Sequence, residues 1–144
     1  MTGTWPPPLS GCAQVRWARP TNDMEPVLRF YCDGLGLPRI LSFSDHDGYS
    51  GVVLGLPGTP YHLEFTTHRL DVRCRAPSDD NLLVFYLPSR AAWEGAVGRM
   101  RAAGFAPVEP ANPYWRNGGV TFEDPDGWRV VLMNDGGIGA TVLG

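Results

Sequence analysis

The feature that most constrains this fold is an order of predicted elements that occurs twice along the chain. A strand, a helix and three further strands are expected within residues 12–68, and the same order is expected within residues 81–135. An offset of about 67 residues aligns "GLGLPRI" with "AAGFAPV" and "YHLEF" with "WRVVLM". The repeated order predicts an internal duplication, in which neither half could cover its own sheet alone. We therefore expect an α+β protein built from two βαβββ modules.

Helix signals support this order in both halves. Asp23 is the expected N-cap of the first helix, whose apolar positions recur at helical spacing: Val27, Leu28, Tyr31 and Leu35. Ser89 is the expected N-cap of the second helix, and Gly104 is expected to end it. One face of that helix carries Trp93, Val97 and Met100.

Length and composition set the boundaries and exclude some functions. The 144 residues suit one domain, which we place at residues 12–136, between a flexible arm at 1–11 and a tail at 137–144. A net charge of -3 without a basic cluster argues against nucleic-acid binding. No apolar run reaches membrane-spanning length. Three cysteines without a CxxC pair indicate reduced thiols in a cytoplasmic protein.

Four segments, in this order, resemble the vicinal oxygen chelate superfamily, which groups glyoxalase I, bleomycin-resistance proteins and extradiol dioxygenases. They are "RPTNDMEPVLRFYCDGLGL", "YHLEF", "RMRAAGFAPV" and "VTFEDPDGWRVVLMN", and together they span about residues 14–134. The resemblance implies that the curved sheets of the two modules form one cavity, often in a homodimer.

In metal-dependent members of that superfamily, His, Glu or Gln side chains from four strands hold the ion. The matching positions here are Arg16, Glu64, Asn81 (or Leu82 if the register differs by one residue) and Val131. Only Glu64 keeps a metal-ligand type, and a guanidinium has no usable lone pair. We therefore expect no metal there. In its place we expect an ion pair between Arg16 and Glu64, with the two side chains within about 6 Å.

Strand alternation extends the predicted cavity face. It adds His62, Leu83, Phe85, Arg129 and Met133, and it directs Trp17, Tyr86 and Trp128 toward the helices. Trp115 lies in the loop "NPYWRNGG" and could cover a planar ligand; packing against the sheet edge or a dimer partner is equally open. His62 and Glu64 could form an acid/base pair, or His62 could simply bond to a neighbour.

These patterns favour a metal-free small-molecule binding protein, similar to the bleomycin-resistance branch, with antibiotic sequestration as one form of that role. The expected ligand-binding residues are Arg16, His62, Glu64, Asn81, Phe85, Trp115, Arg129, Val131 and Met133. We expect a homodimer with no cofactor and no nucleic-acid or membrane partner. The alternative is a glyoxalase-like lyase, isomerase or dioxygenase with a non-standard site at His62 and Glu64. A third possibility is an interaction domain whose cavity is filled by its own side chains.

Overall fold

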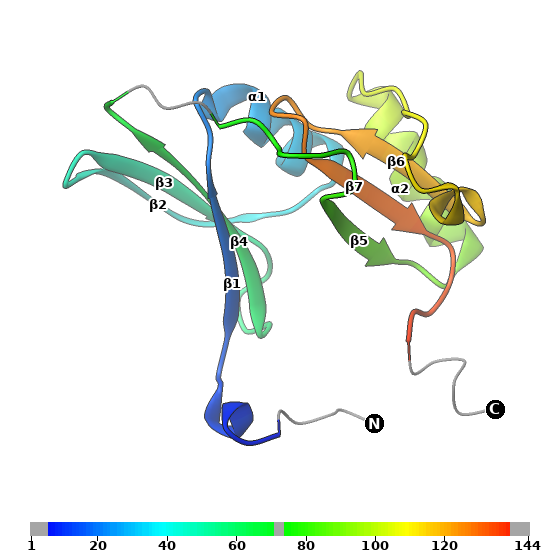
Figure 1. The fold of residues 1–144 in the computed structure, drawn as a ribbon, viewed down its shortest axis with the longest axis horizontal. Helices are drawn as coiled ribbons and strands as arrows, with labels where there is room; N and C mark the ends of the chain where they lie inside the picture. Colours follow the sequence, from blue (N-terminus) through cyan, green and yellow to red (C-terminus); the bar gives the residue numbers. More distant parts are fainter. Residues whose placement is uncertain (1–5, 71–73, 139–144) are drawn as a thin grey trace.

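The first module forms a four-stranded sheet in the order β1-β4-β3-β2. The computed structural model describes residues 6–70 and 74–138. Within the first module, helix α1 continues directly into the π-helical turn η2, and the short 3-10 turn η1 precedes the first strand (Figure 1). The elements are η1 (Leu9–Gly11), β1 (Val15–Pro20), α1 (Met24–Leu28), η2 (Arg29–Gly34), β2 (Arg39–His46), β3 (Tyr49–Leu54) and β4 (Tyr61–His68).

The second module forms a three-stranded sheet in the order β5-β7-β6. Its elements are β5 (Leu82–Tyr86), α2 (Arg90–Ala102), the 3-10 turn η3 (Pro113–Arg116), β6 (Gly119–Glu123) and β7 (Arg129–Met133). The predicted strand "FAPVEP" is reduced to a single bridge between Val108 and Thr121. Pro107 and Pro110 flank Val108 and lack the N–H groups that a longer ladder needs.

The two sheets repeat one pairing pattern. In each, the first strand of the module runs parallel to the last, and the last runs antiparallel to the strand before it. This repeat confirms the α+β prediction of two related modules. Part of the predicted N-terminal arm (residues 1–5) and most of the predicted tail (residues 139–144) lie outside the described residues.

One buried cluster joins the two modules. Figure 1 shows α1 between the upper parts of the two sheets and α2 behind β6 and β7. The cluster contains buried residues of α1, η2, α2 and both sheets: Val27, Leu28, Phe30, Tyr31, Val52, Leu54, Phe65, Met100, Phe122, Val130 and Leu132. In the part of the chain that the structure describes, no helix is long and apolar enough to cross a membrane.

The ends of α2 follow the sequence signals more closely than the start of α1 does. Ser89 Oγ accepts a hydrogen bond from the Ala92 amide at 3.2 Å, as an N-cap does. Gly104 ends the helix with a φ of 98°, a conformation that glycine adopts without strain. At the first helix Asp23 has the expected extended backbone, but its side chain makes no cap hydrogen bond.

Candidate ligand-binding site

Arg16 and Glu64 form the ion pair that the sequence predicts. Nη1 of Arg16 lies 3.1 Å from Oε1 of Glu64. β1 and β4 are parallel neighbours in which Ala18 pairs with Glu64, so Arg16 and Glu64 belong to the same face of the sheet. The Arg16 side chain is 43% exposed and that of Glu64 is 15% exposed, so the pair stands at the edge of solvent.

The repeat between the modules corrects the third ligand position. Val84 pairs with Val131 as Ala18 pairs with Glu64, so the counterpart of Arg16, two residues earlier, is Leu82. Asn81 precedes β5, where its Oδ1 accepts a hydrogen bond from Ser78 Oγ at 2.8 Å. Of the two residues that the sequence left open for this position, the pairing therefore selects Leu82 and not Asn81.

This shift of one residue exchanges the two faces of β5 relative to the prediction. Leu83 and Phe85 pack against the buried core, whereas Val84 and Tyr86 share the face of Val131 and Met133. The prediction that Phe85 shares the face of Val131 is therefore wrong, as is the prediction that Tyr86 faces the helices. Because side chains alternate strictly along a strand, a register error of one residue changes every assignment on it.

The residues at the four former ligand positions do not fit a divalent metal. They are a guanidinium, one carboxylate and two aliphatic side chains, contributed by Arg16, Glu64, Leu82 and Val131. A divalent ion bound by oxygen and nitrogen needs several converging donors. Elsewhere within residues 6–70 and 74–138, no three His, Cys, Asp or Glu side chains are grouped to hold an ion.

The corresponding face of the second sheet is covered by protein. Val131 is fully buried and Met133 is 3% exposed. At Gly119, an added Cβ would lie 2.2 Å from the Trp115 carbonyl oxygen and 2.6 Å from Met133 Sδ. The loop that carries Trp115 therefore packs directly on β6 beside Met133.

Arg129 is also committed to partners within its own module. Its Nη1 donates to the Glu109 carbonyl at 2.9 Å, and its Nε donates to Glu123 Oε1 at 3.2 Å. Nη2 lies 3.5 Å from Asp79 Oδ2. This guanidinium therefore ties β7 to two loops of its module.

His62 hydrogen-bonds to a backbone carbonyl, and no hydrogen bond joins it to Glu64 among the described residues. The ring is buried, and its Nε2 lies 3.0 Å from the Leu56 carbonyl oxygen. A carbonyl only accepts hydrogen bonds, so Nε2 carries the proton. In the neutral ring Nδ1 is then an acceptor. The geometry thus shows the neighbour-bonded histidine rather than a His62–Glu64 pair.

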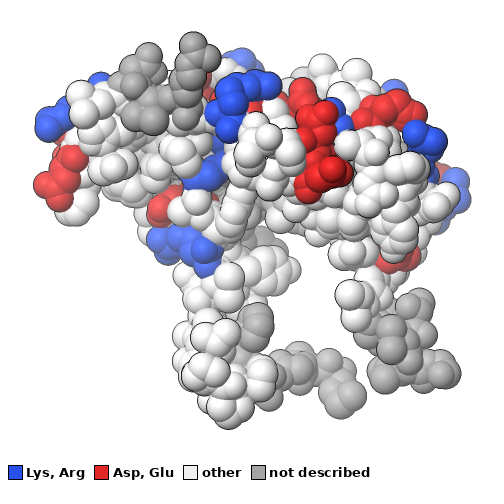
Figure 2. Space-filling model, in the orientation of Figure 1, with Lys and Arg blue, Asp and Glu red and all other residues white. Residues whose placement is uncertain are grey.

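Two cavities lie between the modules, and the predicted site residues divide between them. His62 and Phe85 line a cavity of about 570 Å³, with Leu54, Leu63, Leu83 and Leu87. Asn81 and Arg129 line a smaller one of about 230 Å³, whose walls include Trp17, Trp128 and Tyr31. Figure 2 shows charged side chains mainly on the upper part of this face, whereas the residues described in its lower part are mostly uncharged.

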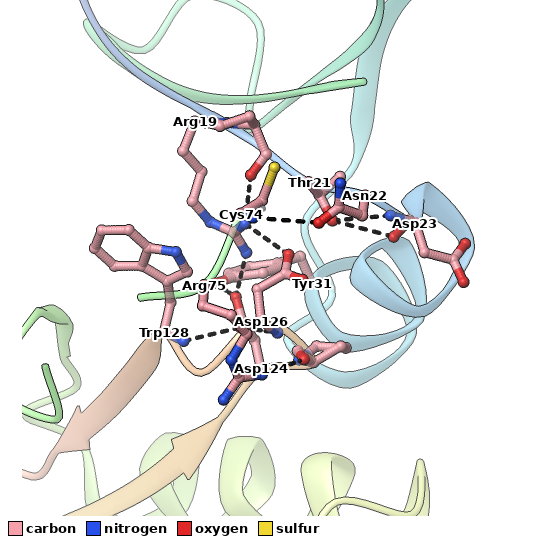
Figure 3. A network of polar contacts seen from close by, with 12 residues as sticks. Arg19, Thr21, Asn22, Asp23, Tyr31, Cys74, Arg75, Asp124, Asp126 and Trp128 are labelled. Carbon is pink, nitrogen blue, oxygen red and sulfur yellow. Dashed lines mark hydrogen bonds and ion pairs between the residues drawn. The ribbon is translucent and has the colours of Figure 1, made fainter. Parts of the chain in front are cut away.

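A buried polar network that the sequence analysis missed fixes the modules to each other. Asp124 Oδ2 accepts from Arg19 and, at 2.7 Å, from the Tyr31 hydroxyl, while Arg19 Nη1 donates to Asp126 Oδ2 at 2.8 Å (Figure 3). Asp124 Oδ1 accepts from the amides of Asp126 and Trp128 at 2.8 and 3.0 Å. In the sequence, the only signal for this network is the pair of carboxylates in "DPDG", and that pattern indicates a turn rather than a buried site.

Burial sets the protonation of this network. It raises the pKa of Tyr31 well above its ordinary value of 10.0, and the negative charge of Asp124 adds to the rise. The guanidinium of Arg19 opposes that rise. The network connects β1 and η2 of the first module to the turn before β7 of the second, so it links the two modules that form the walls of the cavities.

Comparison with known proteins places the chain in a family. Residues 15–66 match the YycE-like N-terminal domain and residues 80–134 match the YycE-like C-terminal domain. The chain is 50% identical over 126 residues to the protein YycE of Bacillus subtilis (strain 168), a match that covers 88% of this chain and 91% of that protein. The crystal structure of B. subtilis YycE superposes with a TM-score of 0.83 at 49% identity, over 90% of this chain and 94% of the other.

More distant structures share the fold. The trypanothione-dependent glyoxalase I of Leishmania major gives a TM-score of 0.65 at 18% identity, covering 83% of this chain and 84% of the other. TnmS3, an antibiotic-binding protein of Streptomyces sp. CB03234, gives 0.56 at 20% identity, covering 82% and 91%. The chain therefore belongs to the YycE-like family and has the glyoxalase/bleomycin-resistance fold of the vicinal oxygen chelate superfamily.

Proposed function

We propose that this protein binds a small drug-like or metabolite-like molecule without a metal and without making or breaking a bond. The observation that carries the proposal is the 3.1 Å ion pair between Arg16 and Glu64 at two former ligand positions. Apolar side chains, Leu82 and Val131, take the other two. Recognition by charge and shape is the chemistry that such a set supports.

Some polar atoms of the ion pair remain available to bind a ligand. Only Nη1 of Arg16 and Oε1 of Glu64 are joined. Nε and Nη2 of Arg16, and Oε2 of Glu64, make no hydrogen bond with any residue in 6–70 or 74–138. Charge-assisted hydrogen bonds are stronger than neutral ones, so these groups can orient a polar end of a ligand.

A protein of the same fold supports this role. TnmS3 is an antibiotic-binding protein with the same fold. Sequestration of an antibiotic is one form of the activity proposed here. We also propose a homodimer, because Leu41 on β2 and Tyr49 on β3 share one face of the first sheet and are 50% and 49% exposed.

The enzymatic alternative needs His62 and Glu64 to act on one substrate proton. A general base must reach that proton within hydrogen-bond distance, about 3 Å. Among the described residues no hydrogen bond joins His62 to Glu64, and Glu64 is paired with Arg16, so binding is favoured over catalysis by this pair.

The test combines elemental analysis with ligand titration of tag-free protein. We expect no stoichiometric Zn, Ni, Mn or Fe. In a panel of planar antibiotics and metabolites followed by tryptophan fluorescence, we expect a ligand whose affinity falls about tenfold in Arg16→Gln, the loss typical of one charge-assisted hydrogen bond.

Arg90→Gln is the matched control, since Arg90 forms an exposed ion pair with Glu94 on α2, 2.9 Å long. Its ligand affinity should equal that of the wild type. One metal ion per chain that is lost in Glu64→Gln, or substrate turnover lost in that variant, would contradict the proposal.

A further inference from the structure

The larger inter-module cavity has the properties of a ligand pocket in its own right. Its volume of about 570 Å³ lies within the range of roughly 300–1,000 Å³ that small-molecule pockets occupy. Its walls come from both modules, from β4 and the loop before it and from β5. No Asp, Glu, Lys or Arg side chain is among the described residues that line it.

Tyr61 and Tyr86, which are 66% and 43% exposed, stand at the rim of this cavity, whereas its buried polar groups are mostly satisfied within the protein. The Leu56 carbonyl accepts from Thr59 Oγ1 at 2.6 Å and from His62 Nε2 at 3.0 Å. The Thr59 hydroxyl therefore spends its one proton on the backbone. Nδ1 of His62 makes no hydrogen bond with the described residues and is an acceptor when the ring is neutral.

We propose that this cavity binds a neutral, mainly apolar molecule that carries one hydrogen-bond donor, and that His62 Nδ1 accepts from that donor. The inference rests on the proposed function and gives its ligand class. A charged ligand is disfavoured because no opposite charge on the walls would offset its desolvation. A ligand without a donor would leave the buried imidazole acceptor unpaired.

Three dyes with the same rings separate these properties. N-phenyl-1-naphthylamine is neutral, apolar and carries one N–H; its N-methyl derivative lacks the donor; 8-anilinonaphthalene-1-sulfonate adds a negative charge. We expect the first dye to bind saturably, one per chain, with enhanced fluorescence. The N-methyl dye should bind at least about fivefold more weakly, the loss typical of one missing hydrogen bond. The sulfonate should bind more weakly by at least about the same factor, because its charge would lose water without gaining a partner. Equal affinity for the three dyes would overturn the ligand class.

Two substitutions locate the dye. His62→Phe keeps a ring at this position, and the Leu56 carbonyl still accepts from Thr59 Oγ1, but the Nδ1 acceptor is gone, so the preference for N–H over N-methyl should disappear. Leu83→Phe adds bulk to the β5 wall of the cavity and should abolish binding of all three dyes. His46→Phe, at the exposed end of β2, and Leu70→Phe, at a position that is 66% exposed, should bind like the wild type.

Unchanged dye binding in both His62→Phe and Leu83→Phe would overturn the inference. It would also be overturned if sedimentation showed that Leu83→Phe dissociates a dimer while dye binding persists, because a second copy would then occupy the cavity. Failure of this inference is distinct from failure of the proposed function. A ligand that depends on Arg16 but binds without regard to His62 and Leu83 would keep the proposed function and reject the cavity.

Discussion

The hydroxyl of Tyr31, in the π-helical turn η2, donates a 2.7 Å hydrogen bond to Oδ2 of Asp124, in the turn before the last strand. The two residues belong to different modules, and the Tyr31 side chain is 1% exposed. The bond therefore contributes to the angle between the modules as well as to the stability of the turn.

Removing this hydroxyl should destabilise the protein. In Tyr31→Phe the buried carboxylate of Asp124 loses a donor, and we expect the free energy of unfolding to fall by about 1–3 kcal/mol. Urea unfolding followed by circular dichroism measures the change. Tyr114→Phe is the control, because Tyr114 is 60% exposed. Equal stability of the two variants would show that the hydroxyl contributes nothing.

The same tyrosine predicts how stability depends on alkaline pH. Burial, followed by the charge of Asp124, raises the folded-state pKa of Tyr31 well above 10.0, the value expected in the unfolded chain. Above that pH the unfolded state releases the proton while the folded state retains it, so stability falls as pH rises. The fall between pH 9 and 11 should be steeper in the wild type than in Tyr31→Phe, by about 1 kcal/mol per pH unit for one proton. Identical pH slopes in the wild type and Tyr31→Phe would contradict the burial of the Tyr31 hydroxyl.

The two ion pairs of the first strand should respond very differently to loss of their arginine. Arg19 is 3% exposed and Asp124 is fully buried, whereas Arg16 is 43% exposed. Arg19→Met leaves an uncompensated buried carboxylate and should cost about 3–5 kcal/mol. Arg16→Met breaks a solvent-exposed pair and should cost no more than about 1 kcal/mol.

Differential scanning calorimetry of the two variants decides the point. Similar losses of unfolding free energy would mean that the Arg19 network is not held in the buried form described here. The matched pair also separates stability from binding, because only Arg16→Met is expected to weaken ligand affinity.

What could be read from the sequence was the frame and part of the site. Repeated apolar spacing and turn residues locate both modules, and the "DPDG" turn locates β7 well enough to identify Val131. The Arg16–Glu64 pair follows from two strands whose registers are fixed by such motifs. For β5 the sequence leaves the register open between Asn81 and Leu82 and predicts the wrong face for Phe85, because β5 follows a polar loop that offers no fixed point.

The Arg19 network lay beyond the sequence because its members are distant along the chain and meet only through tertiary packing. Arg19 and Asp124 are separated by most of both modules. Neither residue differs in type from the many arginines and aspartates on protein surfaces. Only their common burial distinguishes them.

A substitution at Gly119 tests how closely the Trp115 loop packs on β6. At Gly119 a Cβ would meet the Trp115 carbonyl oxygen at 2.2 Å, a backbone atom that cannot turn aside, so Gly119→Ala must displace the loop. We expect a loss of about 1–3 kcal/mol, as in other overpacked sites. Tryptophan fluorescence should shift as well, because Trp115 moves with its loop.

Gly98→Ala is the matched control, since Gly98 lies within α2 and an added Cβ meets no atom within 4 Å. Alanine is favoured over glycine in a helix by about 1 kcal/mol, so this variant should be more stable than the wild type. Thermal unfolding of the two variants should therefore shift in opposite directions. A Gly119→Ala variant as stable as Gly98→Ala would show that the loop stands away from the sheet, and the face that carries Val131 and Met133 would then be open to a ligand.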